Sequence, residues 1–264
     1  MNTDLLVSDT RHYRIDYEIN PYMSRGLQPD PERAAAEHNS IIAAHRAAGR
    51  AVEYLPSAPE CPDMVYTANT AVVVGNRAVL GRPPGPRLPE IPYVRKWLLQ
   101  HGYEVLDAPY SFSGQGDALR CGPLLLAASG QRTDPRMHAV LADHLGLEVV
   151  PLCTSGPLWY DLDLAVAVIN GPRTVAYCPE ALDESSSNAL HGLGLDLIKV
   201  TAEEAAEFAL NLISDGDTVT MTTGAPLLAA DLRERGFRVV ELDTTELRKG
   251  GGGVRCTALT LGAR

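Results

Sequence analysis

The chain predicts an α/β or α+β fold made of five repeated strand–helix–strand units. Short β-rich runs alternate with amphipathic helical stretches throughout, and helix-start and hairpin signals recur at each repeat. Each unit is roughly 40–55 residues long, a period typical of structural repeats. No Pro/Ser-rich linker or block of like charge interrupts the pattern. We therefore expect a single domain over residues 1–264.

The first unit opens with a strand over 5–8. Asp30 and Pro31 then supply a cap and a first-turn proline, so we expect a helix that runs to Gly49 and a strand over 51–55. Thr201 with Glu204 predicts a capping box for a later helix. The other expected elements are hairpins over 71–80 and 164–177, extended segments at 103–106, 119–128, 147–151, 197–200, 217–221 and 237–242, and helices near 93–101, 134–146, 180–191 and 225–235. A last strand over 254–261 can join the first to complete a fifth unit.

The composition is that of an acidic globular protein. A net charge of −10 and an isoelectric point near 5.2 argue against nucleic acid or an anionic membrane as partner and suit a cationic small molecule. No apolar run reaches the ~18 residues of a membrane span, and residues 1–6 lack the basic start of a secretory signal. We expect a cytoplasmic protein, for which a homodimer is one option.

The cysteines are isolated from one another and show no zinc-ligand spacing. They lie at positions 61, 121, 153, 178 and 256. Isolated cysteines in odd number indicate free thiols in a reducing compartment. We expect no metal and no organic cofactor. The glycines at 114 and 116 lack the full dinucleotide fingerprint, so we also expect no nucleotide site.

Four segments carry the residue types that chemistry needs. They are 62–69 (PDMVYTAN), 112–117 (FSGQGD), 160–163 (YDLD) and 250–256 (GGGGVRC). Taken singly, each has an ordinary structural interpretation: Asp63 suits a turn, 114–117 suits a tight turn, and Cys256 suits packing within an apolar strand. Glycines before a cysteine also let a ligand approach the backbone closely.

Taken together and in this order, the four segments resemble the pentein guanidine-modifying enzymes. That family includes arginine deiminases, dimethylarginine hydrolases, arginine dihydrolases and amidinotransferases. The resemblance covers nearly the whole chain: it begins at 12–13 and 19–23, passes through 87–90 and 129–133, and ends at Cys256. It implies a five-bladed, pseudo-symmetric α/β propeller, in agreement with the five units.

The resemblance implies roles for individual residues. Cys256 matches the nucleophile that attacks the central guanidine carbon. Asp63 and Asp163 match carboxylates that hold the guanidinium through paired hydrogen bonds, which orient the carbon for attack. Arg132 and Arg87 match residues that bind a substrate carboxylate. The other expected substrate contacts come from Asn20, Asn69, Ser113 and Asp117.

Two positions depart from the family pattern. Asp161 occupies the position of the catalytic histidine, and Ser113 that of its glutamate partner. Because both members of one acid–base pair differ together, we expect altered chemistry or its complete loss. A thiol with an ordinary pKa of about 8.5 is mostly protonated without a nearby imidazolium, so a bound cation would have to favour the thiolate.

Three interpretations of Asp161 remain open. Burial beside Trp159 and Tyr160, together with the charge of Asp163, favours its protonated form, which would let it act as acid and base. Alternatively, the leaving group needs less protonation, as in an oxyguanidine. In the third interpretation, Asp161 binds another cationic group. The histidines offer no evident replacement, and those on predicted helices (38, 45, 138 and 144) are expected to face solvent.

The predicted function is therefore a cysteine-dependent C–N hydrolase that acts on a guanidino or amidino compound, such as an arginine derivative, through a covalent adduct. The expected catalytic residues are Cys256, Asp161, Asp163 and Asp63. Two alternatives stay open: a non-catalytic pentein that binds arginine-like ligands or another protein, and an amidinotransferase or lyase of specialised metabolism.

Overall fold

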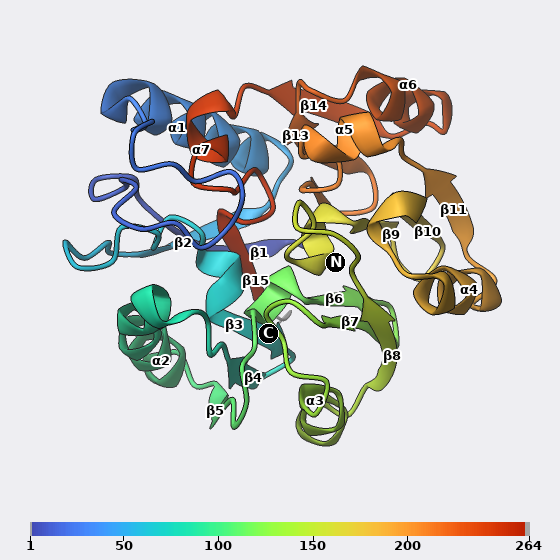
Figure 1. Ribbon diagram of the computed structural model, residues 1–264, viewed down its shortest axis with the longest axis horizontal. Coiled ribbons are helices and arrows are strands. Elements are labelled where there is room, and N and C mark those ends of the chain that lie inside the picture. The colour runs from blue at the N-terminus through green and yellow to red at the C-terminus, as the bar shows by residue number, and fades with distance from the viewer. Residues whose placement is uncertain (1, 262–264) are drawn as a thin grey trace.

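Five three-stranded sheets surround a central axis in the computed structural model, which describes residues 2–261 (Figure 1). In every sheet the middle strand is antiparallel to the inner strand and parallel to the outer one. The helix that joins the two parallel strands lies at the periphery, as a crossover connection requires (Figure 1). The predicted five-bladed α/β propeller is confirmed.

The blades follow one another along the chain. In inner–middle–outer order, their strands are β15 (Ala258–Leu261), β1 (Asp4–Ser8) and β2 (Ala51–Leu55); β3 (Ala71–Val74), β4 (Arg77–Leu80) and β5 (Glu104–Asp107); β6 (Ala118–Cys121), β7 (Leu124–Ser129) and β8 (Glu148–Cys153); β9 (Val166–Asn170), β10 (Thr174–Tyr177) and β11 (Asp196–Lys199); β12 (Ile213–Ser214), β13 (Thr218–Thr222) and β14 (Arg238–Leu242). Antiparallel pairing of β15 with β1 closes the ring, as the sequence predicted.

The crossover helices are α1 (Pro31–Ala47), α2 (Ile91–Gln100), α3 (Met137–Leu145), α4 (Glu184–Gly192) and α6 (Pro226–Glu234), with short helices α5 (Ala202–Ala206) and α7 (Thr245–Arg248). Short 3-10 turns are η1 (Thr67–Thr70), η2 (Gly85–Glu90), η3 (Gly114–Gly116), η4 (Leu162–Leu164) and η5 (Pro179–Ala181). The sequence did not predict α7 or the two-residue strand β12. Among residues 2–261, none of the helices combines the length and apolar character that a bilayer-crossing helix needs.

Local signals fix the ends of the helices. The carboxylate of Asp30 accepts hydrogen bonds from the backbone N–H groups of Glu32 and Arg33, so the predicted start of α1 is confirmed. The capping box at α5 forms only in part. Thr201 accepts from the N–H of Glu204 at 3.2 Å, but the Glu204 carboxylate turns to the N–H groups of 227 and 228. It thereby caps α6, which has no side-chain cap of its own.

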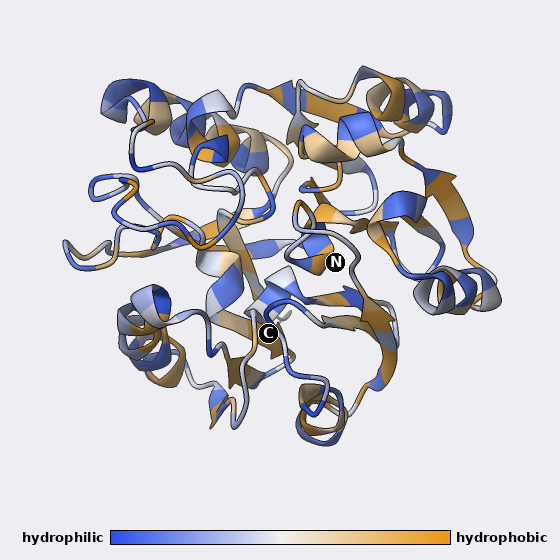
Figure 2. Cartoon of the chain, viewed as in Figure 1, coloured by the Kyte–Doolittle hydropathy of each residue, from blue (hydrophilic) through white to orange (hydrophobic). Residues whose placement is uncertain are grey.

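Apolar side chains fill the space between each sheet and its helix, and the hydrophobic colouring concentrates on the strands (Figure 2). In α2, for example, Val94, Trp97 and Leu98 pack onto the second blade. Fully burying such a side chain contributes about 1.5–3 kcal/mol. This packing makes the blades a rigid frame for the segments between them.

The inner strands β3, β6, β9, β12 and β15 surround an axial cavity of about 520 Å³. The segments that immediately precede these strands meet one another: the N–H of Ala68 binds the carbonyl of Cys256, and the N–H of Arg255 binds the carbonyl of Asn211. The fold thus gathers one segment from every blade at one place on the axis.

Candidate active site

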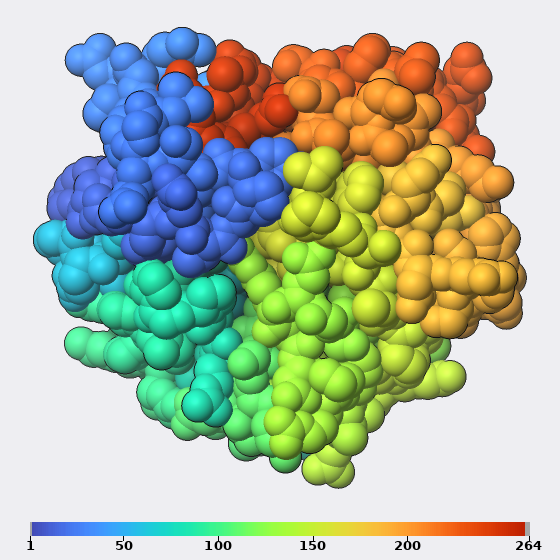
Figure 3. All heavy atoms as spheres, viewed as in Figure 1, coloured from blue at the N-terminus to red at the C-terminus, as the bar shows by residue number. Residues whose placement is uncertain are grey.

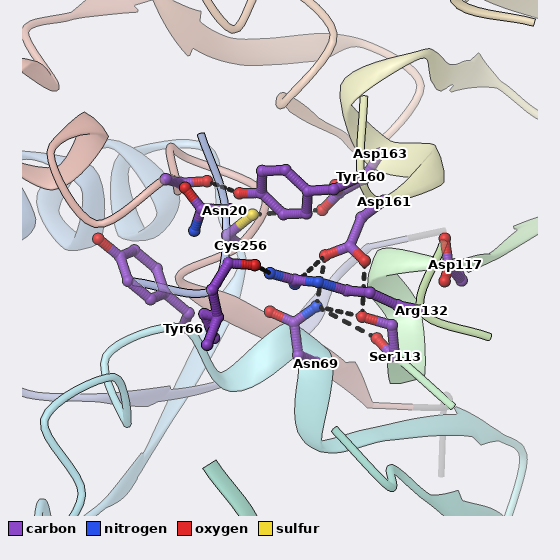
Figure 4. Close-up of polar contacts among 12 residues, drawn as sticks. Asn20, Tyr66, Asn69, Ser113, Asp117, Arg132, Tyr160, Asp161, Asp163 and Cys256 are labelled. Atoms are coloured by element: carbon purple, nitrogen blue, oxygen red, sulfur yellow. Dashed lines mark hydrogen bonds and ion pairs between the residues drawn. The ribbon is translucent and has the colours of Figure 1, made fainter. Parts of the chain in front are cut away.

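Three of the gathered segments, together with loops that carry Asn20, Arg87 and Arg132, line a small cavity; Figure 4 shows the polar side chains around it. Its lining residues are Ile19, Asn20, Asp63, Tyr66, Asn69, Arg87, Arg132, Tyr160, Gly250, Gly251, Gly252 and Cys256. The cavity volume is about 10 Å³, the space of roughly one water molecule. On the outer face, the N-terminal segment (dark blue) lies against the green and yellow segments at the centre of the molecule (Figure 3).

Cys256 lies in the turn before β15, not within the strand as predicted, because that strand begins only at Ala258. Its sulfur accepts a hydrogen bond from Asn211 Nδ2 at 3.1 Å and donates to Asp163 Oδ2 at 3.4 Å. Burial raises the pKa of this thiol well above its ordinary value, and the charges of Asp163 and Asp161 add to the effect. The resting sulfur is therefore a protonated thiol.

Asn211 is the site residue that sequence analysis missed. Its Oδ1 accepts the backbone N–H groups of Gly253, Arg255 and Cys256 at 3.1, 3.0 and 3.1 Å, so one buried amide fixes the whole nucleophile turn. Asn69 lies two residues before the inner strand β3, which begins at residue 71, and Asn211 lies two residues before β12, which begins at residue 213. Cys256 does the same before 258. The fivefold repeat was a signal from which a fifth segment before β12 could have been found, although the sequence analysis named only four.

The glycines before Cys256 are required by close contacts. A Cβ on Gly252 would lie 2.3 Å from the ring of Tyr66 and 3.0 Å from Cβ of Cys256. Gly251 has φ +88°, and a Cβ there would lie 2.4 Å from Nδ2 of Asn20. Asn20 in turn donates to the carbonyl of Gly250 at 3.1 Å. The glycine run therefore lets the backbone form one wall of the cavity.

Asp63 and Asp163 are buried carboxylates, and each has an oxygen, Oδ1, without a hydrogen-bond partner among residues 2–261. Burial raises the pKa of Asp63 to about 7, although Arg87 partly opposes the shift. Burial also raises the pKa of Asp163 to about 7, with a further contribution from the charge of Asp161. Asp63 lines the cavity, whereas Asp163 contacts the sulfur but does not line the cavity. Unpaired buried carboxylate oxygens are costly in free energy, so both of these oxygens lack a compensating donor.

Asp161 is fully occupied by donors. Its Oδ1 accepts from Ser113 Oγ at 2.7 Å, and its Oδ2 accepts from Asn69 Nδ2 at 2.9 Å and Arg132 Nη1 at 3.0 Å (Figure 4). All three groups donate to the carboxylate of Asp161, and one of them is a guanidinium. This arrangement argues against Asp161 as the acid–base group. It favours the interpretation that Asp161 binds a cation, and that cation is Arg132.

Arg132 is held on three sides. Besides Asp161, its guanidinium donates to the carbonyl of Ile19 at 3.2 Å and stacks 4.1 Å from the ring centre of Tyr160. The hydroxyl of Tyr160 donates to the carbonyl of Gly251. Arg132 therefore links the N-terminal segment to the wall of the cavity.

Comparisons with known proteins give the family. The model of the family described as N,N dimethylarginine dimethylhydrolase, eukaryotic, matches residues 124–261. The chain is 37% identical over 250 residues to the N(G),N(G)-dimethylarginine dimethylaminohydrolase of Mycobacterium tuberculosis, with 94% of this chain and 82% of that protein covered. The chain belongs to the dimethylarginine dimethylaminohydrolase family, within the pentein superfamily.

Other members of the superfamily are similar over the same length. The bifunctional arginine dihydrolase/ornithine cyclodeaminase ArgZ of Synechocystis is 32% identical over 97% of this chain, which spans only 37% of that protein. The solved N-terminal domain of ArgZ, bound to its substrate, superposes with a TM-score of 0.94 at 31% identity, with 98% of each chain covered. A dimethylarginine dimethylaminohydrolase structure at 24% identity has a TM-score of 0.82 and supports the fold alone.

None of the residues that line the cavity of this dimethylarginine dimethylaminohydrolase fold is a histidine. Two helical histidines predicted to face solvent, His38 and His45, are instead buried in α1. Burial lowers the pKa of His38 to about 4 and that of His45 to about 3. Neither is a residue of the site. Among residues 2–261, moreover, no group of three or more His, Cys, Asp or Glu side chains could hold a metal ion.

Arg87 differs from its expected role as a substrate-binding residue. Its guanidinium is buried and forms two hydrogen bonds with Glu90, at 2.9 and 2.8 Å, and one with Oδ1 of Asn69 at 2.8 Å. It also donates to the backbone carbonyls of Asp63 and Tyr66. Because these acceptors occupy all three of its nitrogens, the geometry makes Arg87 a positioning residue for Asn69 and Asp63.

Asp117 also differs from its expected substrate contact. Its two oxygens accept from the N–H of Leu162 at 2.9 Å and the hydroxyl of Thr133 at 2.6 Å, and it does not line the cavity. Burial raises its pKa well above the ordinary value, with a contribution from Asp161. Asp117 anchors the segments that carry Asp161 and Arg132.

Proposed function

We propose that this chain is a cysteine-dependent hydrolase that cleaves a C–N bond of a guanidinium or amidinium compound, such as an arginine derivative. The observation that carries the proposal is the pair of buried, unsatisfied carboxylate oxygens, one on the cavity wall and one on the residue that touches the Cys256 sulfur. The relatives named as dimethylarginine dimethylaminohydrolase and arginine dihydrolase support the same reaction class.

Substrate binding rests on Asp63 and Asp163. A guanidinium is planar and presents several N–H donors, so carboxylates at two of its edges orient the central carbon toward the thiol. The hydrogen bonds would also satisfy the oxygens that are unpaired in the free protein, which makes binding more favourable than surface ion pairing. Asn69, held by Arg87, Ser113 and Asp161, is a further polar group on the wall of the cavity.

Asp163 takes the proton of the nucleophile in this proposal. It is within 3.4 Å of the sulfur, and its pKa of about 7 suits both acceptance and return of a proton near neutral pH. A cation bound beside Asp63 and Asp163 offsets the negative charge that Cys256 gains when its thiol loses a proton. It therefore favours the thiolate. Substrate arrival thus activates Cys256.

The reaction then balances in two stages. The thiol proton moves to Asp163 while sulfur forms a bond to the guanidinium carbon. The C–N bond breaks, and the leaving amine takes the proton from Asp163. Water next attacks the S-linked amidinium carbon and gives a proton to Asp163. The C–S bond breaks and Asp163 returns its proton to the sulfur. The proton that the guanidinium brought passes from the urea-type product to the amine, so one water is consumed, and a neutral urea-type product and an ammonium ion are released.

Mass spectrometry of both product and protein tests the proposal. The protein would be incubated with arginine, methylarginines, canavanine and hydroxyarginine, with Cys256→Ala as the control. We expect release of an amine, incorporation of one oxygen from labelled water, and an adduct on Cys256 only. Ligand-induced thermal stabilisation without adduct or turnover would instead establish the non-catalytic binder, which the raised pKa of the thiol favours. Transfer of the amidino group to an added amine would establish the transferase.

A further inference from the structure

We propose that the substrate carries no carboxylate at the end remote from its guanidinium, so that it is an alkylguanidine type of cation and not an amino acid. This inference rests on the proposed function and names its substrate class. It is carried by the buried ion pair between Asp161 and Arg132. In this pair, the guanidinium that could bind the carboxylate of an amino-acid substrate already has a carboxylate partner.

Both cations that line the cavity already have buried carboxylate partners. Arg132 pairs with Asp161 at 3.0 Å, and Arg87 pairs with Glu90 at 2.8 Å. The carboxylate side chains of both pairs are 1% exposed. A substrate carboxylate would have to displace a partner that is fixed, buried and hydrogen-bonded to two other groups, or lie beside it as a like charge.

The second terminal nitrogen of Arg132 and one flat side of its guanidinium are also engaged. Its Nη2 binds the carbonyl of Ile19, and the flat side of the guanidinium lies against Tyr160. A carboxylate is best bound by two parallel N–H groups of one guanidinium. Here Nη1 and Nη2 are already directed to different acceptors, so the edge formed by these two nitrogens is occupied.

The charges around the cavity also favour a cation. When all groups are ionised, Asp63, Glu90, Asp161 and Asp163 contribute −4 and the two lining arginines contribute +2, which leaves −2. A guanidinium brings this charge to −1, and a ligand with a second cationic group brings it to zero. A zwitterionic amino-acid tail adds nothing favourable and places its anion next to Asp161.

A matched ligand pair isolates the carboxylate. Arginine and its decarboxylated form, 4-guanidinobutylamine, share the guanidinium, chain length and amine and differ only in that group. Binding would be measured by calorimetry on the Cys256→Ala protein, and kcat/KM on the unmodified protein. We expect 4-guanidinobutylamine to be preferred over arginine by about tenfold or more in both measurements.

Variants at position 161 test the cause of that preference. Asp161→Asn keeps the shape and frees Arg132, so the preference should shift toward arginine by about tenfold or more. Asp161→Glu keeps the charge and should retain the preference for 4-guanidinobutylamine. A preference for arginine in the unmodified protein, or an unchanged ratio in Asp161→Asn, overturns the inference while leaving the proposed hydrolase intact. Absence of binding and turnover with both ligands overturns the proposed function as well.

Discussion

Replacing Asp63 by asparagine should stabilise the folded protein, and the gain should grow with pH. Asp63 is 2% exposed, and one of its oxygens has no partner among residues 2–261. The nearby Tyr17 hydroxyl lowers the pKa of this carboxyl but lies outside hydrogen-bond geometry. The folded protein therefore disfavours the charge of Asp63, and asparagine removes the charge while keeping the size of the side chain.

The magnitude follows from the pKa. Burial raises it from the ordinary value of 3.8 to about 7. A raised carboxyl pKa means that the folded state holds the proton more tightly, so stability is full below pH 4 and declines as pH rises toward 7. A difference of this size corresponds to roughly 4 kcal/mol, with a slope of about 1.4 kcal/mol per pH unit. The free-energy cost of burying the asparagine amide does not depend on pH. It therefore does not affect how the difference in unfolding free energy between the two proteins changes with pH.

Urea unfolding of both proteins at several pH values between 4 and 8 measures this difference. We expect the free energy of unfolding of Asp63→Asn, relative to the unmodified protein, to rise by roughly 4 kcal/mol across that range and to level off above pH 7. A difference that stays constant or falls with pH would show that Asp63 is not held in a charge-disfavouring environment.

Three further predictions concern the nucleophile. Gly252→Ala should lower the rate of Cys256 alkylation by about tenfold or more because its Cβ would collide with Tyr66, whereas Gly85→Ala, which has open space around it, should not. Asn211→Ala leaves the buried backbone N–H groups of Gly253 and Cys256 unpaired, whereas the N–H of Arg255 keeps the backbone carbonyl of residue 211. The substitution should lower the free energy of unfolding by about 2 kcal/mol or more in urea; a loss below 1 kcal/mol contradicts the proposed anchor. Iodoacetamide labelling of Cys256 across pH should show a thiol pKa above the ordinary range, which guanidinium lowers; a pKa that is low without ligand would be inconsistent with activation by substrate.

The sequence predicted the periodic part of the molecule well. Strand–helix alternation indicated all five blades, and Asp30 with Pro31 predicted the start of α1 because that cap depends on neighbouring residues alone. The same holds for the hairpin that turns at Gly75. What escaped prediction depends on distant contacts: Glu204 forms a cap for α6 instead of its own helix, and the turn at Cys256 is fixed by Asn211 from another blade.

The candidate site divides in the same way. Cys256, Asp63 and Asn69 could be assembled by resemblance, since their segments keep the family pattern. The partners of Arg87 and Asp161 could not, because an ion pair depends on side-chain placement across blades. The sequence left several interpretations of Asp161 open. Only the coordinates could favour the one in which its carboxylate accepts hydrogen bonds from Ser113, Asn69 and Arg132.

The central claim is that the Cys256 sulfur lies within a cation-binding group of carboxylates. Chloroacetamidine and chloroacetamide are nearly identical alkylating agents, but only the first is a cation. Peptide mass spectrometry would follow their reaction with the five thiols. We expect chloroacetamidine to modify Cys256 about a hundredfold faster than chloroacetamide does, with no such ratio at half-buried Cys153. Equal rates at Cys256, or faster labelling by the neutral reagent, would contradict the account.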